Sequence, residues 1–342
     1  MYYLYILLAL VILLLMVTIH EFGHYTAGKL LGFKINEFSI GFGKALYSKT
    51  KKNGEKFSIR VVPLGGYCAF EGEDEESENP DSFMKQKAWK RLIVLFSGAF
   101  FNFLSAIIFS IILLCSVGYD VPKITNIVEV DGNIQTQLQV GDVITHVEGV
   151  EISFIHSHSF NDLIAKYNVG DSFEVTVIRG KEKKNIELQV FEKTDASTGT
   201  KSAVLGINLT SQPYSFGRAL LLSVPFTCVL GWQILKMFGM LLIGKIALSN
   251  LGGPITTITQ MATIGMAGIS NFLVLLPLLA VNLAVFNWLP IPALDGSKMV
   301  FTVVEMIRGK PINQKVENKI HTIGLIVLFA IVIVADLYHL IF

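Results

Sequence analysis

Four long apolar runs, separated by polar stretches, dominate the pattern along the chain. They cover residues 2–19, 92–117, 272–289 and 320–341, with few polar interruptions. At about 1.5 Å per residue, each run is long enough to cross most or all of a hydrocarbon core of about 30 Å. The pattern therefore predicts a polytopic α-helical membrane protein with four transmembrane helices.

A fifth apolar stretch, 217–244, is ambiguous. It is apolar enough to cross a membrane, but Pro225, Gln233 and Lys236 interrupt it. Such a pattern also suits a helix that lies in the membrane interface. If the region 215–270 crosses the bilayer at all, it must cross twice, because basic residues fix the spans on either side. Whether 217–244 crosses is left open.

Two polar stretches have the alternation typical of strands. Residues 38–47 and 56–70 predict a membrane-associated β-hairpin, in which Gly65 and Gly66 permit another backbone to approach closely. An ordinary cytoplasmic hairpin is the alternative. Between 120 and 212, further strand-like segments and turn signals at Asp131-Gly132, Gly141-Asp142 and Gly170-Asp171 predict an inserted β-rich domain.

The positions of the charged residues predict the membrane topology. Apolar residues make up 52% of the chain and charged residues 16%, whereas soluble domains have about 25% charged residues. The net charge of +1 is too small to indicate a nucleic-acid partner. Basic residues gather between the first two runs and between the last two, which places both loops in the cytoplasm. Both termini and the inserted domain are then expected outside it.

The expected segments follow from these patterns. They are a first transmembrane helix (1–30), a cytoplasmic-side hairpin region with an acidic, solvated linker (31–90), a second transmembrane helix (91–118), the β-rich domain (120–212), an amphipathic or re-entrant helical region (213–270), a third transmembrane helix (271–296), a cytoplasmic loop (297–318) and a fourth transmembrane helix (319–342).

The sequence His20-Glu21-Phe22-Gly23-His24 stands at the end of the first run. On a helix its two histidines lie one turn apart on one face, so both imidazoles can bind one Zn²⁺. Glu21 is placed to act as general base on an activated water. A chance match is the alternative. Strongly charged side chains at membrane depth cost about 2.5–3.5 kcal/mol each, so clustered ionisable groups favour a shared metal.

Two histidines leave a catalytic zinc site one protein ligand short. Asp295 is the best candidate for the third ligand, because the third apolar run and the first both end at the cytoplasmic side. Pro290 and Pro292 break the helix before it, and broken backbone at this depth must face protein or a wet cavity. The alternative is that Asp295 only caps the helix that follows.

Taken together, these motifs resemble site-2 proteases and, within them, the bacterial regulator-of-sigma-E protease group. The resemblance runs over nearly the whole chain and is carried by HEFGH at 20–24, FSIGFGK at 38–44, VVPLGGY at 61–67, Asn102, a PDZ-like insert, LGGP at 251–254 and NWLPIPALDG at 287–296. Two places depart from the family pattern: Gly98-Ala99, where members often have Gly-Pro, and Ser297-Lys298, where many have Gly-His.

The resemblance implies a zinc metalloendopeptidase that acts within the bilayer of a bacterial inner membrane. It implies that Zn²⁺ is held by His20, His24 and Asp295, with Glu21 as general base. It also implies regulated intramembrane proteolysis of single-span membrane proteins, commonly anti-sigma factors or remnant signal peptides. The PDZ-like insert would either bind a peptide or filter substrates by size.

Substrate contacts are expected at two further places. The resemblance associates Asn287 with holding substrate, and Pro290 and Pro292 lie beside it in the broken segment. Gly65 and Gly66 are expected where an extended substrate joins a strand edge.

Two other classes of function fit parts of the pattern. Broken helices and intramembrane charges also occur in transporters and channels. A catalytically degenerate scaffold that works through its PDZ-like insert is the second alternative. A Glu21→Gln variant separates them, because a peptidase would lose turnover while still binding zinc.

Overall fold

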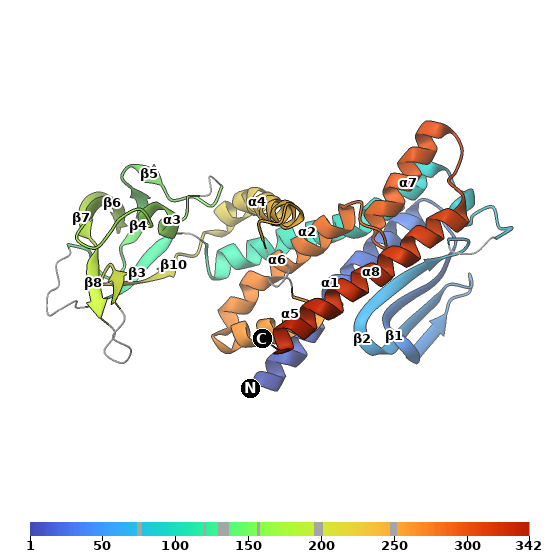
Figure 1. Cartoon of the computed structure of the whole chain (residues 1–342), viewed down its shortest axis with the longest axis horizontal. Helices are drawn as coiled ribbons and strands as arrows, with labels where there is room; N and C mark the ends of the chain where they lie inside the picture. The colour runs from blue at the N-terminus through green and yellow to red at the C-terminus, as the bar shows by residue number, and fades with distance from the viewer. Residues whose placement is uncertain are drawn as a thin grey trace. The chain divides into compact units, whose positions relative to one another are not determined.

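The computed structural model describes residues 1–73, 77–119, 121–128, 137–155, 158–194, 201–246 and 252–341. The chain separates into two compact units (Figure 1). Residues 1–109 with 230–342 form one, called here the helical unit, and residues 110–229 form the other, called the insert unit.

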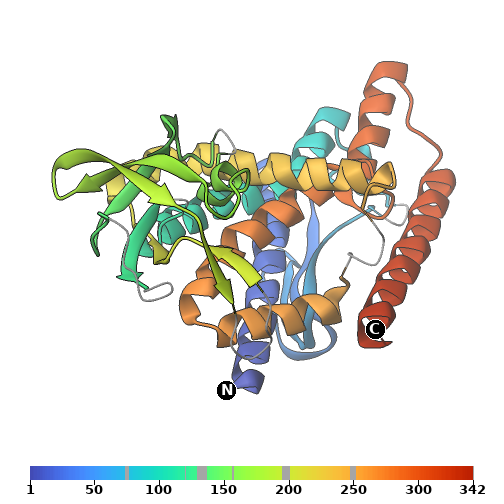
Figure 2. The same cartoon turned by 60° about the vertical axis from the view of Figure 1, so that its left-hand side comes forward.

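Helices make up most of the helical unit. They are α1 (Tyr2–Leu30), α2 (Ala88–Ser116, which continues into the insert unit), the second half of α4 (Phe216–Leu242), α5 (Pro254–Met266), α6 (Ile269–Trp288), α7 (Asp295–Arg308) and α8 (Gln314–Ile341), with a short 3₁₀ turn, η1, at Phe83–Lys85. Figures 1 and 2 both show α1 and α8 running in opposite directions, so that the two termini lie at the same end of this unit.

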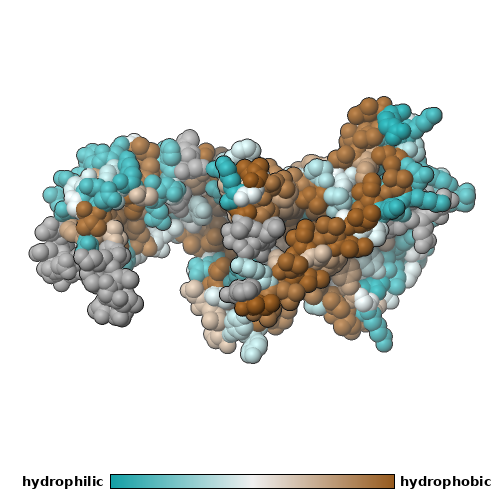
Figure 3. Space-filling model, in the orientation of Figure 1, coloured by the Kyte–Doolittle hydropathy of each residue, from teal (hydrophilic) through white to brown (hydrophobic). Residues whose placement is uncertain are grey.

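Five of the described helices are long and apolar enough to cross a membrane: α1, α2, α4, α6 and α8. The prediction of several long apolar helices is confirmed, but the number four is not. The ambiguous stretch is one continuous helix, α4, with Pro225 inside it. Large apolar side chains of α8 are exposed, among them Ile326, Phe329 and Val334, and apolar surface follows this helix in Figure 3. Such a surface suits contact with lipid.

The segment predicted as a cytoplasmic loop, 297–318, contains a helix. Helix α7 occupies Asp295–Arg308. Apolar residues at Met299, Val303 and Met306 recur at helical spacing. Gly309 ends the helix in the left-handed conformation, with φ 71°. The cytoplasmic location of this segment is a separate prediction.

The hairpin folds back on itself beside α1. Strand β1 (Ile35–Thr50) pairs antiparallel with β2 (Lys56–Phe70). Residues 38–40 of β1 pair with 57–59 on one side and with 66–68 on the other. The last part of β2 is therefore an outer strand, and a cluster of buried residues, Phe33, Ile35, Phe38, Cys68, Phe70, Phe83, Val94 and Leu95, packs the hairpin and η1 against α2. The predicted hairpin is confirmed, with a longer β1.

The insert unit is rich in strands, as predicted. An antiparallel sheet has the order β10-β3-β4-β6-β7, with β5 beside β4, and a separate ribbon pairs β8 with β9. The bounds are β3 Pro122–Ile127, β4 Val143–Val147, β5 Val150–Glu151, α3 Phe160–Ile164, β6 Ser172–Arg179, β7 Glu182–Gln189, β8 Phe191–Thr194, β9 Lys201–Val204 and β10 Ile207–Ser211. The predicted turns at Gly141 and Gly170 have positive φ, whereas Asp131-Gly132 lies outside the described residues.

Candidate metal centre

His20 and His24 lie on the buried face of α1, where they are 9% and 8% exposed. The close approach of α1 to α2 sets this face, since a Cβ at Gly23 would lie 2.4 Å from the Ser97 carbonyl oxygen. Gly98 makes room for both rings, because a Cβ there would lie 2.3 Å from His24 Nε2. The departure from the family pattern at Ala99 leaves this glycine in place.

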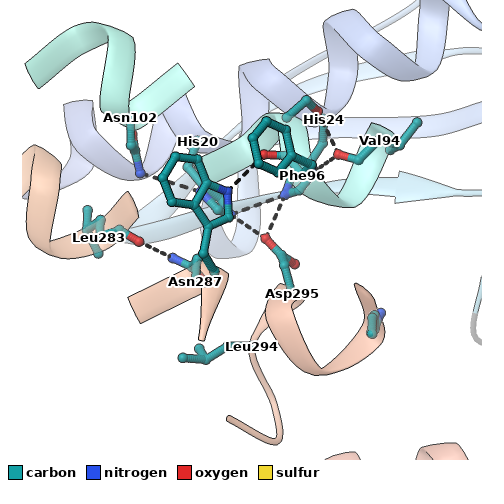
Figure 4. Close-up of polar contacts among 12 residues, drawn as sticks. His20, His24, Val94, Phe96, Asn102, Leu283, Asn287, Leu294 and Asp295 are labelled. Atoms are coloured by element: carbon teal, nitrogen blue, oxygen red, sulfur yellow. Dashed lines mark hydrogen bonds and ion pairs between the residues drawn. The ribbon is translucent and has the colours of Figure 1, made fainter. Parts of the chain in front are cut away.

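Asp295, the first residue of α7, completes a group of three donors. The His20 and His24 Nε2 atoms lie 3.1 Å apart, and Asp295 Oδ2 lies 3.0 and 3.1 Å from them. Figure 4 shows the three side chains pointing toward one another. Around a tetrahedral ion with bonds of about 2.0–2.1 Å, donor atoms stand about 3.3 Å apart. The three residues therefore fit one such ion.

The helix-cap alternative for Asp295 does not describe its side chain. Leu294 occupies the N-cap position of α7, and no side-chain cap hydrogen bond forms there. The Asp295 carboxylate turns instead toward the two imidazoles and is 21% exposed.

A second layer of contacts fixes the histidine rings. His24 Nδ1 lies 2.8 Å from the Val94 carbonyl oxygen, which can only accept, so Nδ1 carries the proton and the lone pair of Nε2 faces the three-donor group. Asn102, fully buried on α2, places its Nδ2 3.4 Å from His20 Nδ1.

The amide of Asn102 points to the same tautomer for His20. Its Oδ1 has no hydrogen-bond partner in the described part of the chain. Amide oxygen and nitrogen are assigned from the hydrogen-bond network, and a rotated amide would let Oδ1 accept a proton from His20 Nδ1. The sequence singles out Asn102 only through the resemblance, and its contact with His20 is a finding of the structure.

Glu21 lies beside the three donors and not among them. The backbone N–H of Cys68, in the outer part of β2, donates to its carboxylate. A cavity of about 340 Å³ adjoins the group and is lined by His20, Glu21, His24 and Asp295, by Tyr67–Phe70 of β2, and by Glu73, Phe83, Val94 and Leu95. The Glu21 carboxyl group, which can act as an acid or a base, therefore lies next to a cavity that can take a peptide.

The predicted substrate residues lie at different distances from this cavity. A Cβ at Gly66 would lie 3.6 Å from Glu21 Cγ, so this glycine adjoins the site, whereas Gly65 lies against Phe42. Asn287 Nδ2 donates to the Leu283 carbonyl oxygen of its own helix at 2.9 Å. Pro290 and Pro292 form the turn that leads to Asp295, and neither lines the cavity.

The acidic linker is more structured than expected at its start. Glu71 accepts a hydrogen bond from Ser77 at 2.7 Å, and Glu73 pairs with Lys298 of α7 at 2.7 Å. Glu73 also lines the cavity beside the three donors. Residues 74–76 lie outside the described residues.

Comparison with known proteins identifies the family. The model of peptidase family M50 matches residues 8–331. The chain belongs to peptidase family M50. The match includes all three donors and Glu21, and it confirms the expected family and the class of enzyme. Membership of a peptidase family favours the predicted enzyme over a transporter or a scaffold.

Bacterial relatives of this M50 peptidase match along nearly their whole length. A Fusobacterium nucleatum protein assigned by name as a zinc metalloprotease is 31% identical and is covered over 94% of both chains. Proteins assigned in the same way from Bartonella henselae and Clostridium perfringens are each 28% identical. The match to the Bartonella henselae protein covers 91% of this chain and 94% of that protein, and the match to the Clostridium perfringens protein covers 99% of both.

One solved structure resembles part of the chain. It is the PDZ domain of the SdrC-like protein from Listeria monocytogenes, which is 23% identical and covers 28% of this chain and 92% of its own, with a TM-score of 0.20. A score this low does not establish the fold of the insert unit, so its PDZ-like character stays a prediction.

Proposed function

We propose that this M50 peptidase is a zinc-dependent intramembrane protease with its centre at His20, His24 and Asp295. One observation carries the proposal: three donor atoms from α1 and α7 lie within 3.1 Å of one another beside a carboxylate and a cavity. The names of its relatives as zinc metalloproteases support zinc as the metal.

The chain supplies the groups that hydrolysis requires. Zn²⁺ held by the three donors would act as a Lewis acid and lower the pKa of a water molecule. Glu21 accepts the proton of the attacking water and returns it to the leaving amine nitrogen. The Cys68 N–H donates to Glu21 and holds its carboxylate next to the cavity. Val94 and Asn102 keep the imidazole lone pairs turned toward the donor group.

A cleavage assay with purified protein tests this proposal. We expect single-span membrane proteins to be cut in detergent, cutting to stop with a chelator, and zinc to restore it. Glu21→Gln should lower turnover by about 10²-fold to 10⁴-fold while zinc stays bound. Glu78→Gln is the control, because that side chain is fully exposed and pairs with exposed Lys85 at 3.7 Å. Cleavage that survives both chelation and Glu21→Gln would rule the proposal out.

Substrate is proposed to join the outer edge of β2 as an added strand. Along an antiparallel strand, alternate residues direct their N–H and C=O groups to opposite edges. Because the Cys68 N–H reaches Glu21, Gly66, Cys68 and Phe70 present their backbone to the site, while Tyr67 and Ala69 face β1. A substrate helix must unwind to be cut. The backbone groups of this edge other than the Cys68 N–H, which donates to Glu21, would hold the extended form through main-chain hydrogen bonds.

Backbone N-methylation of a substrate peptide tests strand addition. Methyl groups at every second residue should block binding when they fall on amides that face β2. Methyl groups on the intervening amides should be tolerated, and they provide the matched control. Equal sensitivity at neighbouring positions would show that substrate is not held as a strand.

We propose that four helices span the membrane, with both termini and the insert unit outside the cytoplasm and the three donors near its cytoplasmic side. Two observations support this: the termini lie at one end of the helical unit, and basic residues gather in two loops. Single cysteines placed at Tyr3 and Asn53 should react with an impermeant reagent from opposite sides of the membrane. Labelling of both from one side would overturn this orientation.

The insert unit is proposed to take a peptide at the edge of its sheet. Strand β10 lies at one edge of the sheet, and a groove of about 420 Å³ separates it from α3. Phe160 and Asn161 line one side, and Leu209 and Thr210 line the other. Removing residues 121–209 distinguishes two roles: a docking site predicts lost cleavage, whereas a size filter predicts retained cleavage of bulkier substrates. Anti-sigma factors and remnant signal peptides are the proposed substrates.

A further inference from the structure

We propose that His321, on the last helix, is a positioning residue of the metal centre. It holds the turn that presents Asp295, without touching the three donors itself. The inference rests on the proposed function only in taking Asp295 as a metal ligand.

The turn between α6 and α7 has an unusual backbone. Ala293 adopts φ 79°, a left-handed conformation that is uncommon for residues other than glycine. It lies between Pro292 and Leu294, only two positions before Asp295. Rotation about Ala293 would swing the start of α7 and move the Asp295 carboxylate away from the histidines. The turn therefore needs outside support to stay in this conformation.

His321 provides that support from α8. The backbone N–H of Ala293 donates to His321 Nδ1 at 3.2 Å. Nδ1 must be unprotonated to accept, which places the ring proton on Nε2, 4.0 Å from a Glu317 carboxylate oxygen. The ring also packs edge-on against Phe301 of α7, with centroids 5.8 Å apart. The imidazole is thus held by the turn, by α7 and by its own helix.

Gly324, three residues further along α8, brings the helix backbone against the same turn. A Cβ at Gly324 would lie 2.2 Å from Pro292 Cβ and 3.0 Å from its carbonyl carbon. A side chain there must push the turn away, because the atoms that it meets belong to a proline ring and to backbone. Gly324 and His321 act together: one allows the approach of α8, and the other forms the hydrogen bond at the strained residue.

The expected consequence is a loss of metal affinity. Groups that orient metal ligands typically change affinity or activity by about 10-fold to 100-fold when they are removed. His321→Ala should weaken zinc binding by that factor, because Ala293 loses its acceptor and Asp295 its fixed direction. His321→Asn should restore most of the affinity, because its Oδ1 can replace Nδ1 as acceptor. Gly324→Ala should weaken binding with His321 intact.

Zinc affinity and backbone exchange test the inference without any substrate. Full-length wild type, His321→Ala, His321→Asn and Gly324→Ala would be compared by chelator competition. Amide hydrogen exchange of 293–297 would be followed by mass spectrometry. Thr322→Ala is the matched control, because the exposed Thr322 hydroxyl donates to the Asn318 carbonyl oxygen of its own helix. We expect faster exchange and weaker zinc binding in His321→Ala and Gly324→Ala. His321→Asn and Thr322→Ala should give values near those of wild type.

Two results would overturn the inference. One is zinc affinity within twofold of wild type in both His321→Ala and Gly324→Ala. The other is weakened binding that His321→Asn does not recover while Thr322→Ala is weakened equally, which is the pattern of general damage to α8. Since neither readout needs a cleavable substrate, a failed protease assay would leave this test intact.

Discussion

Glu55, in the turn between β1 and β2, gives a quantitative test of how the hairpin is held on α1. Its side chain is 4% exposed. It accepts hydrogen bonds from Tyr25 at 2.8 Å and from Lys29 at 3.3 Å, both on α1, and from Lys51 of the turn. Because Tyr25 directly follows His24, these contacts tie the hairpin to the helix that carries two of the three donors.

The charge on Glu55 sets the size of the effect. Burial alone would raise its pKa, but the hydrogen bonds from Lys51 and Tyr25, with those from Asn53 and Lys29, outweigh burial and lower the pKa to about 2. Relative to the usual 4.5, this corresponds to about 3 kcal/mol of stabilisation. Because the folded-state pKa is depressed, this stabilisation is complete above about pH 5 and is lost as the pH falls toward 2. About 1.5 kcal/mol remains at pH 3.

Glu55→Gln mimics the protonated acid at every pH, so it should remove this contribution. Amide exchange of residues 51–56 should then be faster than in wild type by about 100-fold or more at pH 7, but only by about 10-fold at pH 3. Exposed Glu78, changed to glutamine, provides the control and should leave the turn unchanged. A ratio near one at pH 7, or one that does not shrink at pH 3, would refute the reasoning.

Substitutions at three further residues test other contacts. Asn102→Ala should weaken zinc binding by about 10-fold or more while Asn102→Asp retains it, because the carboxylate can still accept from His20; zinc competition decides between them. Asp142→Asn should destabilise the insert unit by about 2–4 kcal/mol, because it removes the negative charge and one of the two oxygens that accept from Arg179 at 2.7 and 2.8 Å. Those bonds, opposed by burial, lower the pKa of Asp142, so the difference should shrink in acid unfolding curves. Asp336→Ala should lower the free energy of unfolding in detergent by about 2–4 kcal/mol, since its carboxylate accepts from the Ile255 and Thr256 amides at the start of α5.

Local sequence patterns predicted the parts of the site that depend on local geometry. The one-turn spacing of His20 and His24 places both rings on one face of any helix. Asp295 was predicted from a missing ligand and a shared membrane depth, and the structure brings it within 3.1 Å of both rings. The strand segments of the hairpin were also recognisable from their alternation.

Contacts between distant segments could not be predicted in this way. His20 meets Asn102 across 82 positions and His24 meets Val94 across 70, and no periodicity specifies which turn of α2 faces α1. The fold-back of β2 depends on a register that pairs Phe38 with both Phe57 and Cys68. Asn287 donates to the Leu283 carbonyl oxygen of its own helix, and its contact with substrate stays a prediction.

The central claim is that two imidazoles and one carboxylate hold a single zinc ion. X-ray absorption at the zinc edge of the purified full-length chain tests it most directly. We predict one zinc per chain, a first shell of nitrogen and oxygen at about 2.0–2.1 Å and the scattering of two imidazoles, with His24→Ala showing one imidazole or no metal. A sulfur neighbour at about 2.3 Å, or a spectrum that His24→Ala and Asp295→Ala leave unchanged, would contradict it.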